Sequence, residues 1–270
     1  MTNPNTDEMD VESYLSLFAQ FGTTDYDYLR RHYPRFCQTR KLFREQNPDA
    51  NGKRLLDLGA HWLHQSVLYA QDGYKVTAAD FPATTELDSV VKLASYFDIE
   101  LMSYHDISQA NQFDQFEENS FDVIVFTELI EHITFNPVDL WKGLYRILSP
   151  QGKIIVTTPN YYYYYSRVRD FRRMIHRMGG GIPVMDILST KTYGHHWKEY
   201  SANELTAYFQ MLSNDFYVNR LEYTCIINHP YQWLEDLGAR LLPVLFRQNI
   251  YAEVLLREKT DGILLEPHWG

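Results

Sequence analysis

The stretch "RLLDLGAHWLHQSVLYAQDGYKVTAADF", residues 54–81, decides the fold class. It contains a short apolar strand that ends at Gly59, a helix, a "DG" turn and a second apolar strand that ends at Asp80. A strand, a helix and a second strand in this order form a parallel βαβ unit, and nucleotide-like cofactors bind where such strands end. Only one glycine stands in the first loop, where such loops usually carry two or three. The stretch therefore predicts a cofactor site with an unusual loop.

Strands and helices continue to alternate after this stretch. Helices are predicted in "DSVVKLASYF" and "NPVDLWKGLYRILSPQG", and strands in "IELMSYHDI", "FDVIVF", "KIIVTTPN", "FYVNRLEYTC" and "IYAEVLLREK". Strands separated by helices of this length build a parallel sheet with right-handed crossovers. The predicted fold is α/β, with a doubly wound, mostly parallel seven-stranded sheet.

Four regions follow from this pattern. Residues 1–50 are predicted to form an N-terminal helical cap, and residues 51–160 the cofactor-binding half of the α/β domain. Residues 161–200 fit no strand-helix unit and are predicted to be an insertion, or lid, after the fifth strand. Residues 201–270 return to the same domain, beginning with a capping box in "SANE".

Composition limits the function and the compartment. The formal net charge of −10 disfavours a nucleic-acid partner, because phosphate contacts need a basic surface. Two cysteines, Cys37 and Cys225, are too few for a disulfide framework or a metal motif. The polar N-terminus resembles no targeting peptide, and no apolar run has the length of a membrane span. We expect a soluble, cytoplasmic protein.

Six segments in order resemble class I S-adenosylmethionine-dependent methyltransferases, in particular the ubiquinone-biosynthesis O-methyltransferase group. They are "LLDLGA", "VTAADF", "SYHDI", "FDVIVFTELIEHI", "LSPQGKIIVTTPN" and "GHHWKEYSANEL". The resemblance implies a Rossmann-like methyltransferase fold with S-adenosylmethionine as cofactor. The cofactor-binding residues that it implies are Asp57, Gly59, Ala60, His61, Asp80, Phe81, Asp106, Ile107, Thr127 and Glu128.

Two of these acids have specific expected roles. Asp80 lies 23 residues after Asp57, the spacing expected of an acid whose two oxygens accept hydrogen bonds from the ribose hydroxyls. The alternative is that Asp80 only starts a turn. By resemblance, Asp106 accepts from the adenine amine, and the alternative is that it caps a turn.

The loop departs from the family pattern D-x-G-x-G-x-G, because His61 and Leu63 replace glycines. Side chains at these positions disfavour some backbone angles that glycine adopts freely. Either the loop takes another path and still binds the cofactor, or the site is a relic. The persistence of the supporting acids favours binding, with the backbone approaching the cofactor at Gly59 and Ala60.

Three histidines are candidates for the catalytic base. An oxygen acceptor has to lose its proton during methyl transfer, and histidine has a suitable pKa. His132 lies in "ELIEHI", which matches a glutamate-histidine pair of the family, and His195 and His196 lie at the end of the insertion. The alternative for each is a structural role. No spacing typical of a closed metal site occurs, so no metal is predicted.

The insertion carries the clues to the acceptor. Val168, Phe171, Ile175 and Met178 form an apolar stripe at helical spacing, among arginines 169, 172, 173 and 177. The stripe can pack as a lid with solvated arginines, the arginines can bind an anionic acceptor, or the helix can lie on an anionic membrane. The apolar tail segment "WLEDLGARLLPVLF" also permits a homodimer.

These observations favour a methyltransferase that acts on oxygen in a small or lipid-linked acceptor of anionic or aromatic character. The alternative is a catalytically inactive methyltransferase-like subunit that binds or regulates a partner. A dinucleotide-linked dehydrogenase is disfavoured, because the G-x-G-x-x-G loop is missing.

Overall fold

The computed structural model describes residues 10–22, 25–225 and 231–268. The chain divides into two compact units, and each is described by itself. The first contains the described residues up to His105 together with Phe121–Val125. The second contains residues 106–120 and 126–225 and the described residues from 231 onward. The sequence prediction about a targeting peptide concerns residues 1–9, which lie outside the described residues.

The first unit is a parallel α/β layer. Its helices are α1 (Val11–Ala19), α2 (Tyr26–Gln46), α3 (Ser66–Asp72), α4 (Pro82–Thr85) and α5 (Asp88–Phe97). Its strands are β1 (Arg54–Leu58), β2 (Lys75–Asp80), β3 (Glu100–Ser103) and most of β4 (Phe121–Thr127). Strand β1 pairs in parallel with both β2 and β4, and β2 pairs in parallel with β3.

Burial explains why the opening stretch forms this layer. Leu55, Leu56 and Leu58 of β1 are completely buried, as expected for a strand covered on both faces. Helix α3 ends at Gly73, whose φ of 102° gives the left-handed turn that leads into β2. The predicted strand-helix-strand unit is confirmed.

The second unit carries the rest of the secondary structure. Its helices are α6 (Val138–Ile147), α7 (Tyr164–Ile175), α8 (Val184–Ser189), α9 (Ala202–Leu212), α10 (Gln232–Ala239) and α11 (Pro243–Phe246). Short 3-10 turns occupy η2 (Ala110–Phe113), η3 (Ile130–His132) and η4 (Thr192–Gly194). Its strands are β5 (Leu148–Pro159), β6 (Phe216–Thr224) and β7 (Asn249–Leu256), and β7 is antiparallel to both of its neighbours.

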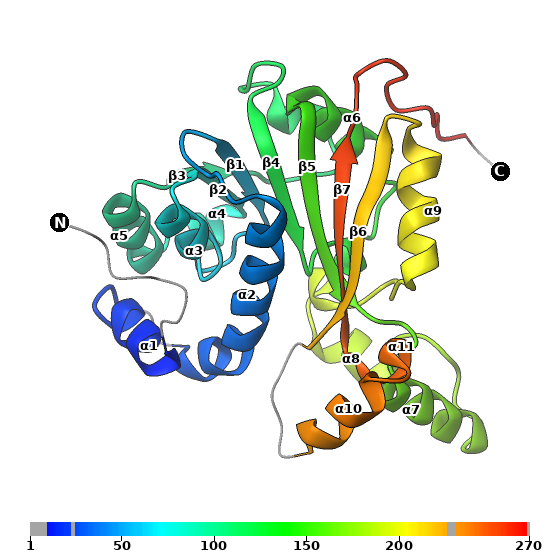
Figure 1. The fold of residues 1–270 in the computed structure, drawn as a ribbon. Coiled ribbons are helices and arrows are strands. Elements are labelled where there is room, and N and C mark those ends of the chain that lie inside the picture. Colours follow the sequence, from blue (N-terminus) through cyan, green and yellow to red (C-terminus); the bar gives the residue numbers. More distant parts are fainter. Residues whose placement is uncertain (1–9, 23–24, 226–230, 269–270) are drawn as a thin grey trace. The chain divides into compact units, whose positions relative to one another are not determined.

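An aromatic core holds this unit together. The ring of Trp141 is completely buried against Phe126 and Phe209, and its Nε1–H donates to the hydroxyl of Tyr208 at 2.7 Å. Helix α9 lies along β6 and β7 (Figure 1). It begins with the predicted capping box, in which Ser201 and Glu204 bond reciprocally.

The strand order is β3-β2-β1-β4-β5-β7-β6. The predicted mostly parallel seven-stranded sheet with flanking helices is therefore confirmed. The four sequence regions stay a prediction. No helix in the described part of the chain is long and apolar enough to cross a membrane.

The predicted insertion and the tail segment come together beyond the end of β5, as helices α7, α8, α10 and α11 (Figure 1). The hydroxyl of Tyr163 donates to Glu235 at 2.5 Å, and the ring of Tyr164 contacts Phe246 at 5.4 Å. The tail segment forms α10 and α11, and Pro243 is the first residue of α11.

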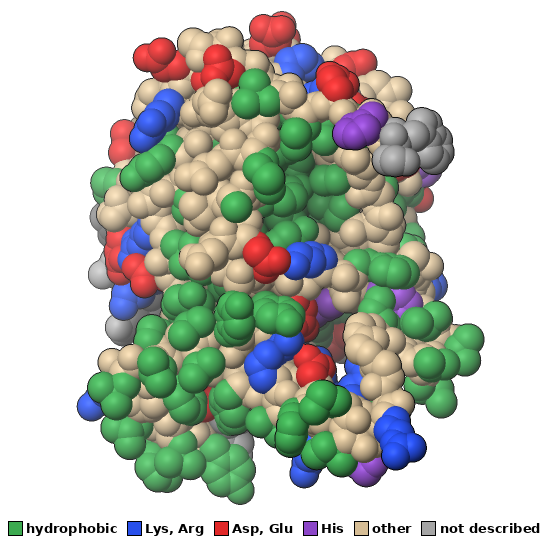
Figure 2. Space-filling model, turned by 90° about the vertical axis from the view of Figure 1, so that its right-hand side faces the viewer, with side chains coloured by type: hydrophobic (Ala, Val, Ile, Leu, Met, Phe, Trp, Pro, Cys, Tyr) green, Lys and Arg blue, Asp and Glu red, His purple; other side chains and the backbone are tan. Residues whose placement is uncertain are grey.

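The apolar stripe of α7 does not pack as a lid in this unit. No residue of α7 is buried, and Phe171 and Ile175 are 58% and 60% exposed. The interpretation that this face packs against the fold is therefore wrong for this structure. Hydrophobic side chains gather over the lower part of the face drawn in Figure 2, at the height of these helices.

Candidate functional site

Asp80 ends β2 in the first unit, and both of its carboxylate oxygens already accept a backbone hydrogen bond. Oδ2 accepts from the N–H of His61 at 2.7 Å, and Oδ1 accepts from the N–H of Phe81 at 2.6 Å. Burial raises the pKa of this carboxyl, while the two backbone donors oppose that shift. A carboxylate has about four acceptor positions, so two remain for a pair of hydroxyls. This geometry fits the ribose role predicted for Asp80.

The loop after β1 follows a path that glycine would favour. Gly59, His61 and Leu63 have φ values of 80°, 49° and 64°, all left-handed. The side chains of His61 and Leu63 disfavour these angles but do not prevent them. Each non-glycine residue in this region costs about 1–2 kcal/mol. The bond from His61 N–H to Asp80 and the burial of Leu63, which is 1% exposed, offset that cost.

Backbone donors at the start of the loop are occupied. The N–H groups of Gly59 and Ala60 both donate to the carbonyl of Ala79, at 2.8 and 3.2 Å. These two N–H groups therefore hold β1 to β2 in this conformation. Any approach of a cofactor to Gly59 and Ala60 has to use the remaining backbone surface.

Aromatic rings wall the loop. The ring centroids of His61 and Trp62 lie 3.9 Å apart, and the ring of Tyr28 in α2 contacts both rings. Burial lowers the pKa of His61 to about 4. Burial and the neighbouring His61 lower the pKa of His64 to about 3. Both imidazoles are therefore neutral at pH 7. A cavity of 640 Å³ opens beside Trp62, lined also by the end of α1 and the start of α5.

Asp57 lies beneath the loop as a support. It is 2% exposed, and its Oδ2 accepts from the hydroxyl of Ser66 at 2.6 Å. Burial raises its pKa to about 7, the Ser66 bond opposes the shift, and the charge of Asp80 adds to it. Its buried position makes Asp57 a residue that positions the loop through Ser66 at the start of α3.

Phe81 packs against Tyr104 in the same unit, with ring centroids 5.0 Å apart. In the second unit, Asp106 is exposed and its Oδ1 accepts from the N–H of Ser108 at 2.9 Å; the Ser108 side chain and this backbone bond lower its pKa. This is the turn-capping geometry that was the alternative for Asp106. Ile107 is 8% exposed.

Thr127 and Glu128 follow the buried part of β4. Glu128 has a left-handed backbone, with φ of 50°. Its N–H donates to the carbonyl of Thr157, and its Oε1 accepts from the Thr157 hydroxyl and from the Asn249 side chain, each at 2.8 Å. Strands β5 and β7 therefore fix the carboxylate of Glu128 at the end of β4.

His132 has a defined hydrogen-bonding state. Its Nδ1 lies 3.1 Å from the carbonyl oxygen of His195, which can only accept, so Nδ1 carries the proton. Nε2 then has a lone pair, and it lies 3.9 Å from Oε1 of Glu131. Partial burial lowers the pKa of His132, with His196 adding to the effect. The imidazole is therefore neutral at pH 7, with Nε2 unprotonated.

Glu131 anchors the chain that carries the other two histidines. It is completely buried, and its Oε2 accepts from the hydroxyl of Thr158 at 3.0 Å. Its carbonyl accepts from the N–H of Trp197 at 2.7 Å, which places His195 and His196 beside His132. The His132 and His196 rings meet edge to face at 4.8 Å.

The structure brings together three side chains that could coordinate a metal ion, which the sequence spacing did not indicate. Glu131, His132 and His196 each offer one ligand atom, and these atoms lie within 4.8 Å of one another. His195 is not in the group, since it contributes its carbonyl and is itself 6% exposed.

Comparison with known proteins identifies the family. A family model described as a methyltransferase domain matches residues 29–212, which is more than half of the chain. The chain belongs to the methyltransferase-domain family. The predicted S-adenosylmethionine-dependent methyltransferase is thereby confirmed at the level of the family, and the ubiquinone-biosynthesis group stays a prediction. A search of curated proteins gives no match.

Solved structures share the fold of this methyltransferase. An S-adenosylmethionine-dependent methyltransferase from Archaeoglobus fulgidus is 15% identical, with a TM-score of 0.53 over 86% of this chain and 100% of that one. Magnesium protoporphyrin IX methyltransferase from Synechocystis PCC 6803, solved with bound SAH, is 11% identical, with a TM-score of 0.55 over 90% and 93%. A methyltransferase from Mesorhizobium loti is 15% identical, with a TM-score of 0.52 over 80% and 96%.

Each unit of the methyltransferase gathers its own set of predicted residues. Asp57, Gly59, Ala60, His61, Asp80 and Phe81 meet in the first unit, and Glu128, His132, His195 and His196 in the second. Sequence reasoning missed Thr157 and Asn249, which hold Glu128. In the sequence, a polar asparagine directly before the apolar stretch "IYAEVLL" could have indicated a functional role for Asn249. The structure shows that it is fully buried.

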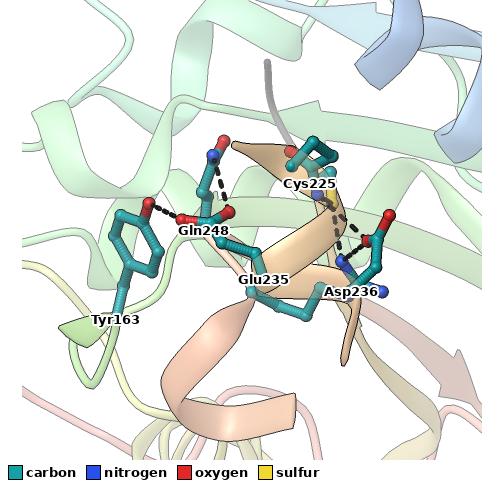
Figure 3. A network of polar contacts seen from close by, with 7 residues as sticks. Tyr163, Cys225, Glu235, Asp236 and Gln248 are labelled. Atoms are coloured by element: carbon teal, nitrogen blue, oxygen red, sulfur yellow. Dashed lines mark hydrogen bonds and ion pairs between the residues drawn. The ribbon is translucent and has the colours of Figure 1, made fainter. Parts of the chain in front are cut away.

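A separate polar network connects helices α10 and α11 to neighbouring parts of the second unit. Tyr163 and Gln248 both donate to Glu235, while the guanidinium of Arg247 donates to Asp236 and to the Cys225 sulfur (Figure 3). Burial raises the pKa of the Cys225 thiol. This network fixes α10 and α11 against the start of α7 and is structural.

Proposed function

We propose that this methyltransferase moves a methyl group from S-adenosylmethionine to an oxygen of its acceptor, with His132 as the general base. The observation that carries the proposal is the Nδ1–H bond of His132 to the His195 carbonyl. It fixes the tautomer that leaves Nε2 able to take a proton. The lowered pKa keeps that nitrogen unprotonated at neutral pH.

The residues at the strand ends fit the cofactor. Asp80 keeps acceptor capacity for two ribose hydroxyls, and neutral aromatic rings line the neighbouring loop. Neutral aromatic rings suit a sulfonium, because ring faces attract positive charge. When bound, S-adenosylmethionine supplies an electrophilic methyl group.

The residues around His132 define how a proton is handled. As the oxygen nucleophile attacks, its proton passes to Nε2, and the imidazolium is stabilised by the His195 carbonyl at Nδ1 and by the nearby carboxylates of Glu131 and Glu128. Glu131 also holds the backbone of Trp197, so it positions the histidine pair. We assign His195 and Glu131 as positioning residues.

One cation near the histidines suits an anionic group on the acceptor. Burial is the main cause that lowers the pKa of His196; the charge of Glu128 opposes the shift, and the nearby charge of Arg169 adds to it. An arginine beside the base suits a carboxylate or phosphate on the acceptor. We therefore propose a small or lipid-linked hydroxyl compound of anionic or aromatic character.

Two measurements test the proposal in parts. Calorimetric titration with S-adenosylmethionine should show binding to wild type, and Asp80→Ala should weaken it by about 1–3 kcal/mol for each lost hydrogen bond. Absence of binding to wild type would support the inactive-subunit alternative instead.

Turnover with a panel of phenolic, carboxylated and lipid-linked hydroxyl compounds tests the base. His132→Ala should lower kcat about 10²–10⁴-fold, with cofactor affinity unchanged. His196→Ala serves as the matched control, because its ring lies beside His132 without the carbonyl bond. A kcat that survives His132→Ala but not His196→Ala would move the base to His196.

A further inference from the structure

Exposed hydrophobic side chains are concentrated on one part of the second unit. Among the described residues, 21 of the 29 large hydrophobic side chains that are exposed lie in residues 161–197 and 231–242. These segments make up less than a fifth of the chain. Apolar patches of this extent on a soluble fold mark an interaction surface. We call these two segments the apolar patch.

The two segments form one structure. The first turn of α7 contacts α10 through Tyr163 and Glu235, and α11 through Tyr164 and Phe246. Arg173 donates to the carbonyl of Gly181 at 2.6 Å, which ties α7 to the turn that leads into α8. Figure 2 shows hydrophobic groups interspersed with Lys and Arg over this lower region.

The patch is basic within an acidic chain. Its two segments together contain six arginines and one lysine against three aspartates and one glutamate, whereas the whole chain has a formal charge of −10. Asp170 pairs with Arg167 at 3.1 Å, and in the other segment Asp236 pairs with Arg247. Arg172 and Arg177 are exposed and make no ion pair with any described residue.

The geometry points to an anionic phospholipid bilayer as the partner of the apolar patch. Apolar side chains such as Leu188 and Leu241, 78% and 84% exposed, would enter the headgroup region. Arg172 and Arg177 would meet lipid phosphates. Exposed Tyr165 and Trp233 have the amphipathic rings that favour a membrane interface.

A second copy of the chain fits the charge less well. In a two-fold interface the same surface faces itself, so the arginines of one patch would meet those of the other. Like charges placed opposite each other across an interface are unfavourable. The membrane surface therefore suits both the apolar and the basic character of the patch, and it does so whichever acceptor is methylated.

The test is sedimentation of the full chain with vesicles of phosphatidylcholine alone, or of phosphatidylcholine mixed with phosphatidylglycerol. Binding should require the anionic lipid. It should weaken in 0.5 M salt, because the Debye length is then only about 4 Å and the charges are screened. The double variant Arg172→Glu/Arg177→Glu should bind at least ~25-fold more weakly. Arg31→Glu/Lys41→Glu, exposed cations of α2 that change the net charge equally, should bind as wild type does.

A second pair of variants tests the apolar contribution. Leu188→Ser/Leu241→Ser should reduce binding to anionic vesicles, whereas Val91→Ser/Met211→Ser, which also replaces exposed residues, should not. Wild type that fails to bind anionic vesicles at low salt would overturn the inference. So would binding that is unaffected by either patch variant. Light scattering that shows a dimer converted to a monomer by Leu188→Ser/Leu241→Ser would assign the patch to self-association instead.

Discussion

The loop between β1 and α3 and the helical insertion after β5 differ in what fixes them. In the loop, Ala60, Leu63 and His64 are buried, and the backbone at Gly59, His61 and Leu63 is left-handed. In the insertion, α7 and α8 have no buried residue at all. The loop is held by contacts within its own unit, whereas the insertion presents its apolar side chains outward. Substitutions should therefore affect stability in the loop region and partner binding in the insertion.

The largest effect is expected where a buried ion pair holds α3, the helix that follows the loop. Arg40 of α2 donates to Asp72 at 2.8 Å, and both side chains are almost fully buried. Arg40→Ala removes the buried partner of Asp72 and leaves only the partly exposed Arg44, 3.8 Å away, which should lower the free energy of unfolding by about 3–5 kcal/mol. Chemical denaturation followed by circular dichroism measures the loss.

The insertion offers a matched ion pair that is partly exposed. Arg167 lies 3.1 Å from Asp170 and 3.4 Å from Glu199. Arg167→Ala should cost no more than about 1 kcal/mol, because exposed pairs contribute little. Equal losses for Arg40→Ala and Arg167→Ala would remove the contrast between the two regions.

The second prediction concerns pH. The folded-state pKa of Asp57, about 7, lies above its ordinary value of 3.8, so the folded chain binds this proton more tightly than the unfolded chain does. The associated stability is complete below pH 3.8 and is lost as pH rises toward 7, by up to about 4 kcal/mol. Asp57→Asn should flatten this dependence, because asparagine keeps an acceptor for Ser66 and does not ionise.

Thermal melts of both proteins between pH 4 and pH 8 measure that difference. Asp80, whose pKa is also raised, remains in both proteins, and because its charge acts on Asp57, the measured difference includes the interaction between the two carboxyls. Parallel stability curves for wild type and Asp57→Asn would show that Asp57 does not titrate in this window.

The third prediction separates two residues of the same loop. Leu63→Gly relieves the cost of a left-handed backbone, about 1–2 kcal/mol, but leaves a cavity at a buried position. We expect the free energy of unfolding to fall by about 2 kcal/mol in total. His61→Gly relieves similar strain and loses mainly the stacking on Trp62, so its change should stay within about 1 kcal/mol. Denaturation midpoints distinguish the two, and a larger loss for His61→Gly would reverse their assigned roles.

The sequence was sufficient for the parts of the molecule that depend on local pattern. The strand and turn signals around Gly73 and the capping box at Ser201 predicted elements that the structure confirms. The left-handed angle at Leu63 could not be predicted, because it is maintained by tertiary burial, which the local sequence does not show. The fixation of Glu128 by Asn249 likewise joins positions 121 residues apart.

The insertion shows another limit of sequence reasoning. The period of Val168, Phe171 and Ile175 correctly placed these side chains on one helical face. A hydrophobic period states which residues share a face, and it does not state what covers that face. Only their exposure in the structure, 49–60%, distinguishes a surface for a partner from a packed lid.

The smallest effect is expected from polar substitutions in the insertion. Phe171→Ser and Leu188→Ser replace side chains that are 58% and 78% exposed, and surface changes of this kind usually alter stability by less than about 0.5 kcal/mol. Both variants should therefore melt with wild type in the absence of lipid. A loss near 2 kcal/mol, comparable to Leu63→Gly, would mean that these side chains are packed in solution. The insertion would then resemble the loop, and its apolar face would serve the fold instead of a partner.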